Sequence, residues 1–120
     1  MIVEHNPINL KLMQAVLSVA GHSVITATNR EEVLQWLCTI RPELILMDMQ
    51  LKDNKSLELI RRIKADPATK DIKIIAVTRD WSKDDEVQAL AAGCAGYITK
   101  QISTRTLPLF VADLLNRIET

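Results

Sequence analysis

Short apolar runs alternate with longer amphipathic segments along the whole chain, and this pattern predicts strands and helices in turn. Five of the runs have the length of strands, and they cover residues 1–3, 23–27, 43–48, 72–78 and 95–99. The third run contains LILM at residues 44–47, which is apolar without a break. Continuous apolarity is typical of a strand that is buried on both faces, so we expect this strand at the centre of the sheet.

The first two amphipathic segments have apolar residues at helical spacing and capping signals at their ends. The Asn-Pro pair at residues 6–7 suits the start of the first helix, and Gly21 suits its end near residue 20. Thr28 and Glu31 form a capping box for the second helix, and Pro42 ends it.

The remaining three segments predict helices in the same way. The third helix ends near the Asp-Pro pair at residues 66–67. Ser82 suits the N-terminal cap of the fourth helix, which Gly93 ends. The fifth helix begins at Ser103 or at Thr106. Its apolar positions are Leu107, Val111, Leu114 and Ile118.

This (βα)5 pattern predicts a single α/β domain over residues 1–120. A helix between successive strands makes the strands parallel and the crossovers right-handed. We expect a doubly wound three-layer sandwich whose five-stranded sheet has the order 2-1-3-4-5, which is the flavodoxin-like winding. In such a fold the functional site lies beyond the carboxyl ends of the strands, where the winding reverses between strands 1 and 3.

Composition and charge narrow the classes of function. The chain has 15 basic and 15 acidic side chains and a formal net charge of zero, so we expect no direct nucleic-acid binding. No apolar run approaches the roughly 20 residues of a membrane span, and no signal peptide is evident. Cys38 and Cys94 fit no metal-binding or redox spacing. We therefore expect a cytoplasmic protein without a membrane partner.

Polar residues follow four of the predicted strands, on the edge of the sheet where the site is expected. They are Glu4 and His5 after the first strand, Asp48 at the end of the third, Thr78 and Arg79 at the end of the fourth, and Lys100 after the fifth. Two carboxylates, an imidazole, a hydroxyl, a guanidinium and an ammonium group should therefore meet in one crevice.

Four segments at these positions resemble the motifs of response-regulator receiver domains, the CheY-like domains of two-component phosphorelay systems. IVEHNPINLKLM resembles the first strand, acidic turn and first helix, and LILMDMQL resembles the strand that carries the phosphoryl acceptor. AVT resembles the threonine motif of strand 4, and AAGCAGYITK resembles the segment around strand 5. The resemblance covers essentially the full chain, and the joint spacing of the motifs is more specific than any one of them.

The resemblance implies a role for each matching residue. Asp48 would accept a phosphoryl group from the phosphohistidine of a partner histidine kinase or phosphotransfer protein. Lys100 would pair with the phosphoryl oxygens, and Thr78 would donate a hydrogen bond to one of them. Glu4, Asp48 and the backbone carbonyl of Gln50 would hold Mg²⁺.

The resemblance also implies how the signal would leave the domain. Tyr97 would turn after Thr78 moves, and the surface formed by the fourth helix, the fifth strand and the fifth helix would change. A downstream protein target would bind this surface, and a weak homodimer through it is a further option. The implied catalysis is limited to self-phosphorylation at Asp48 and slow autodephosphorylation.

The sequence departs from the family at several positions around the expected site. His5 stands where the family has a second acid that binds Mg²⁺ directly, although Mg²⁺ prefers oxygen ligands. Arg79 replaces a small residue, and Gln101 replaces the proline that usually follows the lysine. Lys52 and Ser56 replace a proline and a glycine in the loop after the acceptor.

These departures change the charge of the site. With His5 neutral, two acids face Lys100 and Arg79, so the site has no net charge where the usual site has a net charge of about −2. One hypothesis is that Arg79 pairs with Asp48 or Glu4 and takes over part of the role of Mg²⁺, which would weaken metal binding and phosphorylation. Alternatively, Arg79 points to solvent and the site works normally, or His5 and Asp48 bind a transition metal.

Three functions of different classes stay open at this point. The first is a receiver that is phosphorylated on Asp48, and the second is a degenerate receiver that acts as a phosphorylation-independent protein-interaction module. The third is a haloacid-dehalogenase-like phosphatase, which also uses an aspartate at the end of a strand. That family has a second aspartate two residues later, where this chain has Gln50, and the chain has no room for a cap domain.

Overall fold

The structure is a computed structural model, and it describes residues 1–51, 56–78, 82–99, 107–109 and 111–112. These residues form a five-stranded parallel sheet with the order β2-β1-β3-β4-β5, which confirms the predicted winding. The strands are β1 (Ile2–Val3), β2 (Thr26–Ala27), β3 (Leu44–Asp48), β4 (Lys73–Thr78) and β5 (Gly96–Thr99).

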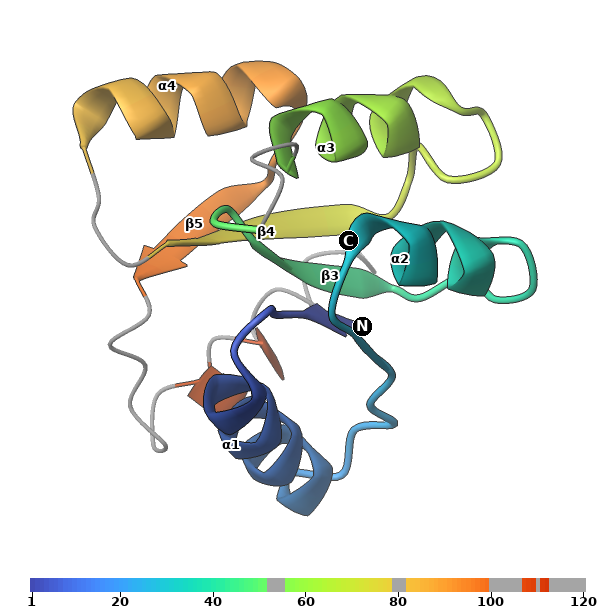
Figure 1. Cartoon of the computed structure of the whole chain (residues 1–120), viewed down its shortest axis with the longest axis vertical. Helices are drawn as coiled ribbons and strands as arrows, with labels where there is room; N and C mark the ends of the chain where they lie inside the picture. Colours follow the sequence, from blue (N-terminus) through green and yellow to red (C-terminus); the bar gives the residue numbers. More distant parts are fainter. Residues whose placement is uncertain (52–55, 79–81, 100–106, 110, 113–120) are drawn as a thin grey trace.

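Four helices that the described residues form in full pack on the two faces of this sheet. They are α1 (Pro7–Val19), α2 (Arg30–Leu37), α3 (Ser56–Ala65) and α4 (Lys83–Ala92). In Figure 1, α2, α3 and α4 lie on one side of the strands and α1 lies on the other. This arrangement is the predicted three-layer sandwich, in which β3 is buried along its whole length.

Two apolar clusters separate the layers. One joins α2, α3 and α4 to the sheet through side chains such as Val33, Ile60 and Ala89. The other joins α1 and the helical residues 107–109 and 111–112 to the opposite face, around Met13 and Leu17. Successive residues of β3 alternate between the two clusters, because side chains of a strand point to opposite faces in turn. The continuous apolar run of β3 therefore serves both clusters.

The predicted starts of the first and fourth helices are confirmed. The side chain of Asn6 accepts hydrogen bonds from the backbone N–H groups of Ile8 and Asn9, at 2.9 and 3.3 Å. Ser82 Oγ accepts one from the N–H group of Asp85 at 3.1 Å. Both caps satisfy amide groups that have no partner inside the first turn of a helix.

The predicted cap and end of the second helix are wrong. Asn29, not Thr28, caps α2, because its side chain reaches the N–H group of Glu32 at 2.9 Å. The Glu32 side chain in turn accepts a hydrogen bond from the N–H group of Thr28 at 3.1 Å. The capping pair is therefore Asn29 and Glu32, one residue later than the expected Thr28 and Glu31. The helix ends at Leu37 instead of running on to Pro42. The next amides turn back to carbonyl groups three and four residues earlier, which tightens the last turn.

Each strand also begins later than predicted, β3 and β4 by one residue. β1 and β2 have two residues each, so the strand expected at residues 23–27 is ladder-paired only at its carboxyl end. β5 begins at Gly96, one residue later than expected. Residues 107–109 and 111–112 are helical, as expected for the fifth helix. The two alternative starts of that helix, Ser103 and Thr106, and its apolar positions Leu114 and Ile118 lie outside the described residues.

Candidate functional site

The carboxyl ends of β1, β3 and β4 bring three buried polar side chains to one edge of the sheet. Val3 pairs with Met47 and Asp48 pairs with Val77, so the residues that follow these strands lie side by side. Glu4, Asp48 and Thr78 are 1%, 0% and 4% exposed. Burying an ionised carboxylate is costly unless other groups stabilise the charge, so a pair of buried acids marks a site built for more than packing.

Asp48 is held by its own backbone surroundings. The N–H group of Gln50 donates to Asp48 Oδ1 at 2.8 Å, and the N–H group of His5 donates to Asp48 Oδ2 at 3.2 Å. Ser56 Oγ donates to the backbone carbonyl of Asp48 at 2.7 Å. The N–H group of Met49 donates to the carbonyl of Val77 at 2.9 Å, which ties the turn after Asp48 to β4. The carboxylate is therefore fixed in direction before any ligand arrives.

His5 lies between the two buried acids. Its Nδ1 atom makes a hydrogen bond with Asp48 Oδ2 and lies 3.5 Å from Glu4 Oε1. Glu4 Oε1 also accepts the N–H group of Asn6 at 3.2 Å. The side chain of His5 is 31% exposed, so it connects the buried acids to solvent. The sequence placed His5 at the same site as the two acids and left open a metal site shared by His5 and Asp48, but it did not predict a direct hydrogen bond between them.

Glu4, His5 and Asp48 form a group of potential metal ligands, with one ligand atom from each lying within 4.8 Å of the others. The two carboxylates suit Mg²⁺, the ion that receiver domains bind in general. The third atom is an imidazole nitrogen, and Mg²⁺ takes oxygen ligands in near-octahedral geometry. An imidazole in the third place therefore fits Mg²⁺ less well than an oxygen ligand would, and the role predicted for the Gln50 carbonyl stays a prediction.

Tyr97 lies on β5 and links that strand to α4. It is 37% exposed, and β5 places it opposite Ala76 of β4. A hydrogen bond with the side chain of Glu86 raises the pKa of Tyr97, and the negative charge of Glu86 raises it further. Thr78, the predicted partner in switching, ends the neighbouring strand and is buried.

Some predicted site residues cannot be placed. Arg79, Lys100 and Gln101 lie outside the described residues, as does Lys52. The hypothesis that Arg79 pairs with an acid of the site therefore stays a prediction. From the sequence, Ser56 stood out only because it replaces a usual glycine. In the structure, its hydroxyl group supports the end of the strand that carries Asp48.

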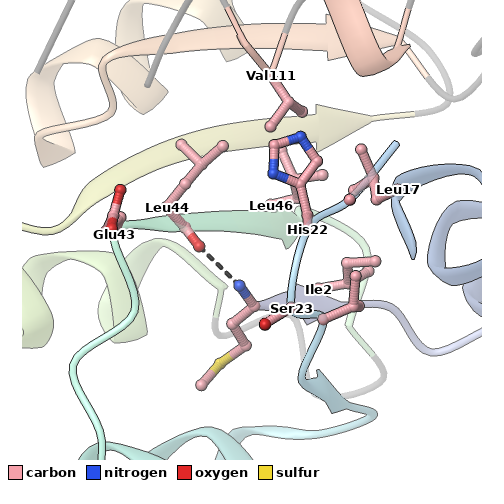
Figure 2. A pocket seen from close by; sticks show the side chains of 11 residues that line it. Ile2, Leu17, His22, Ser23, Glu43, Leu44, Leu46 and Val111 are labelled. Atoms are coloured by element: carbon pink, nitrogen blue, oxygen red, sulfur yellow. Dashed lines mark hydrogen bonds between the residues drawn. The ribbon is translucent and has the colours of Figure 1, made fainter. Parts of the chain in front are cut away.

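A hollow lies at the opposite edge of the sheet from Asp48, by the amino ends of the strands. It has a volume of about 320 Å³. Figure 2 shows that apolar side chains such as Leu17, Leu46 and Val111 line it, with His22 and Glu43 also at its wall. Most of its apolar lining belongs to the cluster that packs α1 on the sheet. This hollow lies at the other end of β3 from Asp48, so it plays no part in the candidate site.

Comparison with known proteins agrees with the fold. Residues 1–112 match the family described as response regulator receiver domain. The polar-differentiation response regulator DivK of Brucella anthropi is 39% identical over 114 residues, which are 95% of this chain and 90% of that protein.

Solved structures show the same architecture. A CheY-like response regulator receiver domain protein from Methanospirillum hungatei has a TM-score of 0.89 at 27% identity, covering 98% of this chain and 93% of that one. A two-component response regulator from Clostridium difficile has a TM-score of 0.91 and covers 99% and 96% of the two chains. At 23% identity, that second likeness shows the fold alone.

The sheet order and the acidic cluster at the switch point define a flavodoxin-like α/β domain with a site at the ends of β1 and β3. The chain belongs to the response regulator receiver domain family of two-component signalling.

Proposed function

We propose that the domain accepts a phosphoryl group on Asp48 from the phosphohistidine of a partner histidine kinase or phosphotransfer protein. The observation that carries the proposal is the setting of Asp48, which is fully buried, ends the central strand and has both carboxylate oxygens oriented by backbone N–H groups. An Asp48 oxygen attacks the phosphorus, the phosphorus–nitrogen bond breaks, and the imidazole of the partner leaves with its electron pair and takes up a proton.

The residues of this chain contribute mainly by positioning. A carboxylate has about four lone-pair sites, and the described backbone donors use one on each oxygen. The imidazole of His5 makes a further hydrogen bond with Oδ2. We propose no other catalysis than the part the domain plays in its own phosphorylation and in the slow loss of the phosphoryl group.

The response would travel from Thr78 to Tyr97 and on to the surface formed by α4, β5 and the fifth helix. Thr78 is buried at the end of β4, so a new phosphoryl group at Asp48 would act on it at close range. Val87 and Leu90 of α4 are 58% and 47% exposed, which suits a surface that binds a downstream protein. A weak homodimer through this surface, like a cytoplasmic location, stays a prediction.

The surface next to the site favours a protein as the phosphoryl donor. Ile8, Leu12 and Val19 of α1 are exposed by 78%, 47% and 89% and follow one another at helical spacing. α1 begins two residues after His5, so this apolar stripe starts beside the cluster of Glu4, His5 and Asp48. No helix among the residues that the structure describes is long and apolar enough to span a membrane.

One observation favours a second candidate, a degenerate receiver that signals through protein contact without phosphate. The imidazole of His5 lies against the Asp48 oxygen and occupies space that the phosphoryl group needs. If this contact persists, Asp48 is a structural residue and the surfaces of α1 and α4 carry the function.

Incubation with acetyl phosphate and a divalent cation, followed by intact-mass measurement, separates the two candidates. We expect one phosphoryl adduct on the native chain, none on Asp48→Asn, and an unchanged adduct on the matched control Asp71→Asn, because Asp71 is exposed and lies before the start of β4. A native chain without an adduct under Mg²⁺, Mn²⁺ and Co²⁺ alike would leave only the degenerate receiver.

A further inference from the structure

The group formed by Glu4, His5 and Asp48 contains two kinds of metal ligand. Two are buried carboxylates and one is a half-buried imidazole whose Nδ1 atom faces both of them. Around a small cation at about 2.0–2.2 Å, neighbouring ligand atoms lie roughly 3.0–3.4 Å apart. The separation of 3.5 Å between His5 Nδ1 and Glu4 Oε1 is already close to that value. All three ligand atoms lie within 4.8 Å of one another, and side-chain rotations that open the hydrogen bond between His5 and Asp48 would place them around one ion.

The remaining contacts keep this donor set in place. The N–H groups of His5 and Gln50 hold the Asp48 carboxylate, and the N–H group of Asn6 holds Glu4. Supporting hydrogen bonds of this kind orient metal ligands and raise affinity. The exposed part of the His5 ring gives an ion a way in from solvent.

The nitrogen atom changes which ion the group should prefer. Mg²⁺ binds oxygen and gives up water reluctantly, whereas imidazole suits Co²⁺, Ni²⁺ and Zn²⁺. Replacing a carboxylate by a neutral imidazole also removes one negative charge, which weakens a hard cation most. The charge of the three ligands is then −2 instead of −3, and one ligand is a borderline base.

We propose that Glu4, His5 and Asp48 form a site for a divalent transition-metal ion that accepts nitrogen ligands, with His5 as the residue that turns its preference away from Mg²⁺. The proposal rests on the proposed function, because it names the kind of ion that accompanies Asp48, but binding itself requires no phosphoryl group. On binding, any proton that His5 Nδ1 carries leaves to the buffer or moves to Nε2, and the nitrogen donates its lone pair to the metal.

The test compares Co²⁺ with Mg²⁺ on three chains. Because sites made only of carboxylates also bind Co²⁺ more tightly than Mg²⁺, the ratio in the native chain decides nothing by itself. The informative quantity is the change of the ratio Kd(Mg²⁺)/Kd(Co²⁺) in His5→Asp, with His22→Gln as the matched histidine control. All three chains carry Cys38→Ser, because the exposed Cys38 thiol is a competing ligand for Co²⁺.

We expect titration calorimetry to show that His5→Asp lowers the ratio about tenfold or more, through weaker Co²⁺ binding and stronger Mg²⁺ binding, while His22→Gln leaves it unchanged. In the native chain, proton NMR should show a strongly shifted Co²⁺-bound imidazole resonance that persists in His22→Gln. This second readout needs no His5 variant, so it stays decisive if His5→Asp fails to fold. A ratio that His5→Asp leaves unchanged, or the absence of the shifted resonance at saturating Co²⁺, overturns the proposal.

Intact-mass measurement of the acetyl phosphate reaction on the same chains separates this proposal from the proposed function. Co²⁺ binding through His5 without a phosphoryl adduct on Asp48 would support the metal site and refute the proposal that Asp48 is a phosphoryl acceptor. A phosphoryl adduct formed under Mg²⁺, together with a ratio Kd(Mg²⁺)/Kd(Co²⁺) that His5→Asp leaves unchanged, would support Asp48 as the phosphoryl acceptor and refute the metal site.

Discussion

Gly93 and Gly21 offer a matched pair of substitutions that separates backbone strain from side-chain crowding. Both glycines have positive φ angles, +114° and +95°, at the ends of α4 and α1. A Cβ atom at Gly93 would lie 2.7 Å from Lys64 Cγ, whereas one at Gly21 would have no atom within 4 Å. Lys64 Cγ is near the root of its side chain, so it cannot move aside alone.

The structure gives a magnitude for each substitution. The left-handed conformation costs a non-glycine residue about 1–2 kcal/mol, and the stiffer unfolded chain returns about 0.4–1 kcal/mol. Gly21→Ala should therefore destabilise by about 1 kcal/mol. At Gly93 the displaced Lys64 also loses hydrogen bonds to the carbonyls of Lys70 and Ile72, at 2.8 and 2.7 Å. These bonds contribute about 0.5–1.5 kcal/mol each, so Gly93→Ala should cost about 2–4 kcal/mol.

Urea unfolding followed by far-UV circular dichroism measures both free energies of unfolding. In a Lys64→Ala background, which removes Cγ and leaves only Cβ at 3.4 Å, the cost of Gly93→Ala should fall close to that of Gly21→Ala. This double-mutant cycle isolates the crowding. Equal costs for the two single glycine substitutions, or a cost at Gly93 that Lys64→Ala does not reduce, would refute the reasoning.

Two further predictions follow from the side-chain environments of Cys94 and Tyr97. Burial raises the pKa of the Cys94 thiol to about 11, against a smaller opposing effect of Lys64. A thiol reagent at mildly alkaline pH should therefore label the exposed Cys38 and leave Cys94 unmodified until the chain unfolds, and equal labelling of both in the folded chain would contradict this. Glu86 raises the pKa of Tyr97, so Glu86→Gln should lower the midpoint of the tyrosinate absorbance titration. Because the folded-state pKa is the higher one, this contribution to stability is present at neutral pH and is lost as the pH rises through the tyrosine titration. The chain has a single tyrosine, so the absorbance titration reports on Tyr97 alone. A midpoint that Glu86→Gln leaves unchanged would exclude the contact with Glu86.

Local signals predicted most of the fold because they act within a few residues. The run LILM identified a strand buried on both faces, and β3 is buried from end to end. Asn6 and Ser82 cap helices as expected, since a short polar side chain reaches the amides two or three residues ahead. Thr28 and Asn29 are neighbours with similar capping ability, so the sequence alone could not choose between them.

The candidate site likewise has parts that the sequence predicts and parts that it does not. Asp48 could be placed from the sequence because an acid that closes a buried apolar run must emerge at the end of the strand. Glu4, His5 and Thr78 could be placed at the same end of the sheet, but the hydrogen bond of His5 with Asp48 could not be predicted, because it joins residues 43 positions apart and depends on the register of β1 against β3. The hydroxyl of Ser56 reaches the Asp48 carbonyl only because α3 folds back against the strand end.

By itself the sequence determined the order of strands and helices, the family and the acid at the centre of the site, since periodicity, caps and motif spacing are properties of the chain alone. Only the tertiary structure decided that an imidazole lies between two buried carboxylates. Ligand geometry is set by strand register and side-chain rotamers, which the packing of distant segments selects.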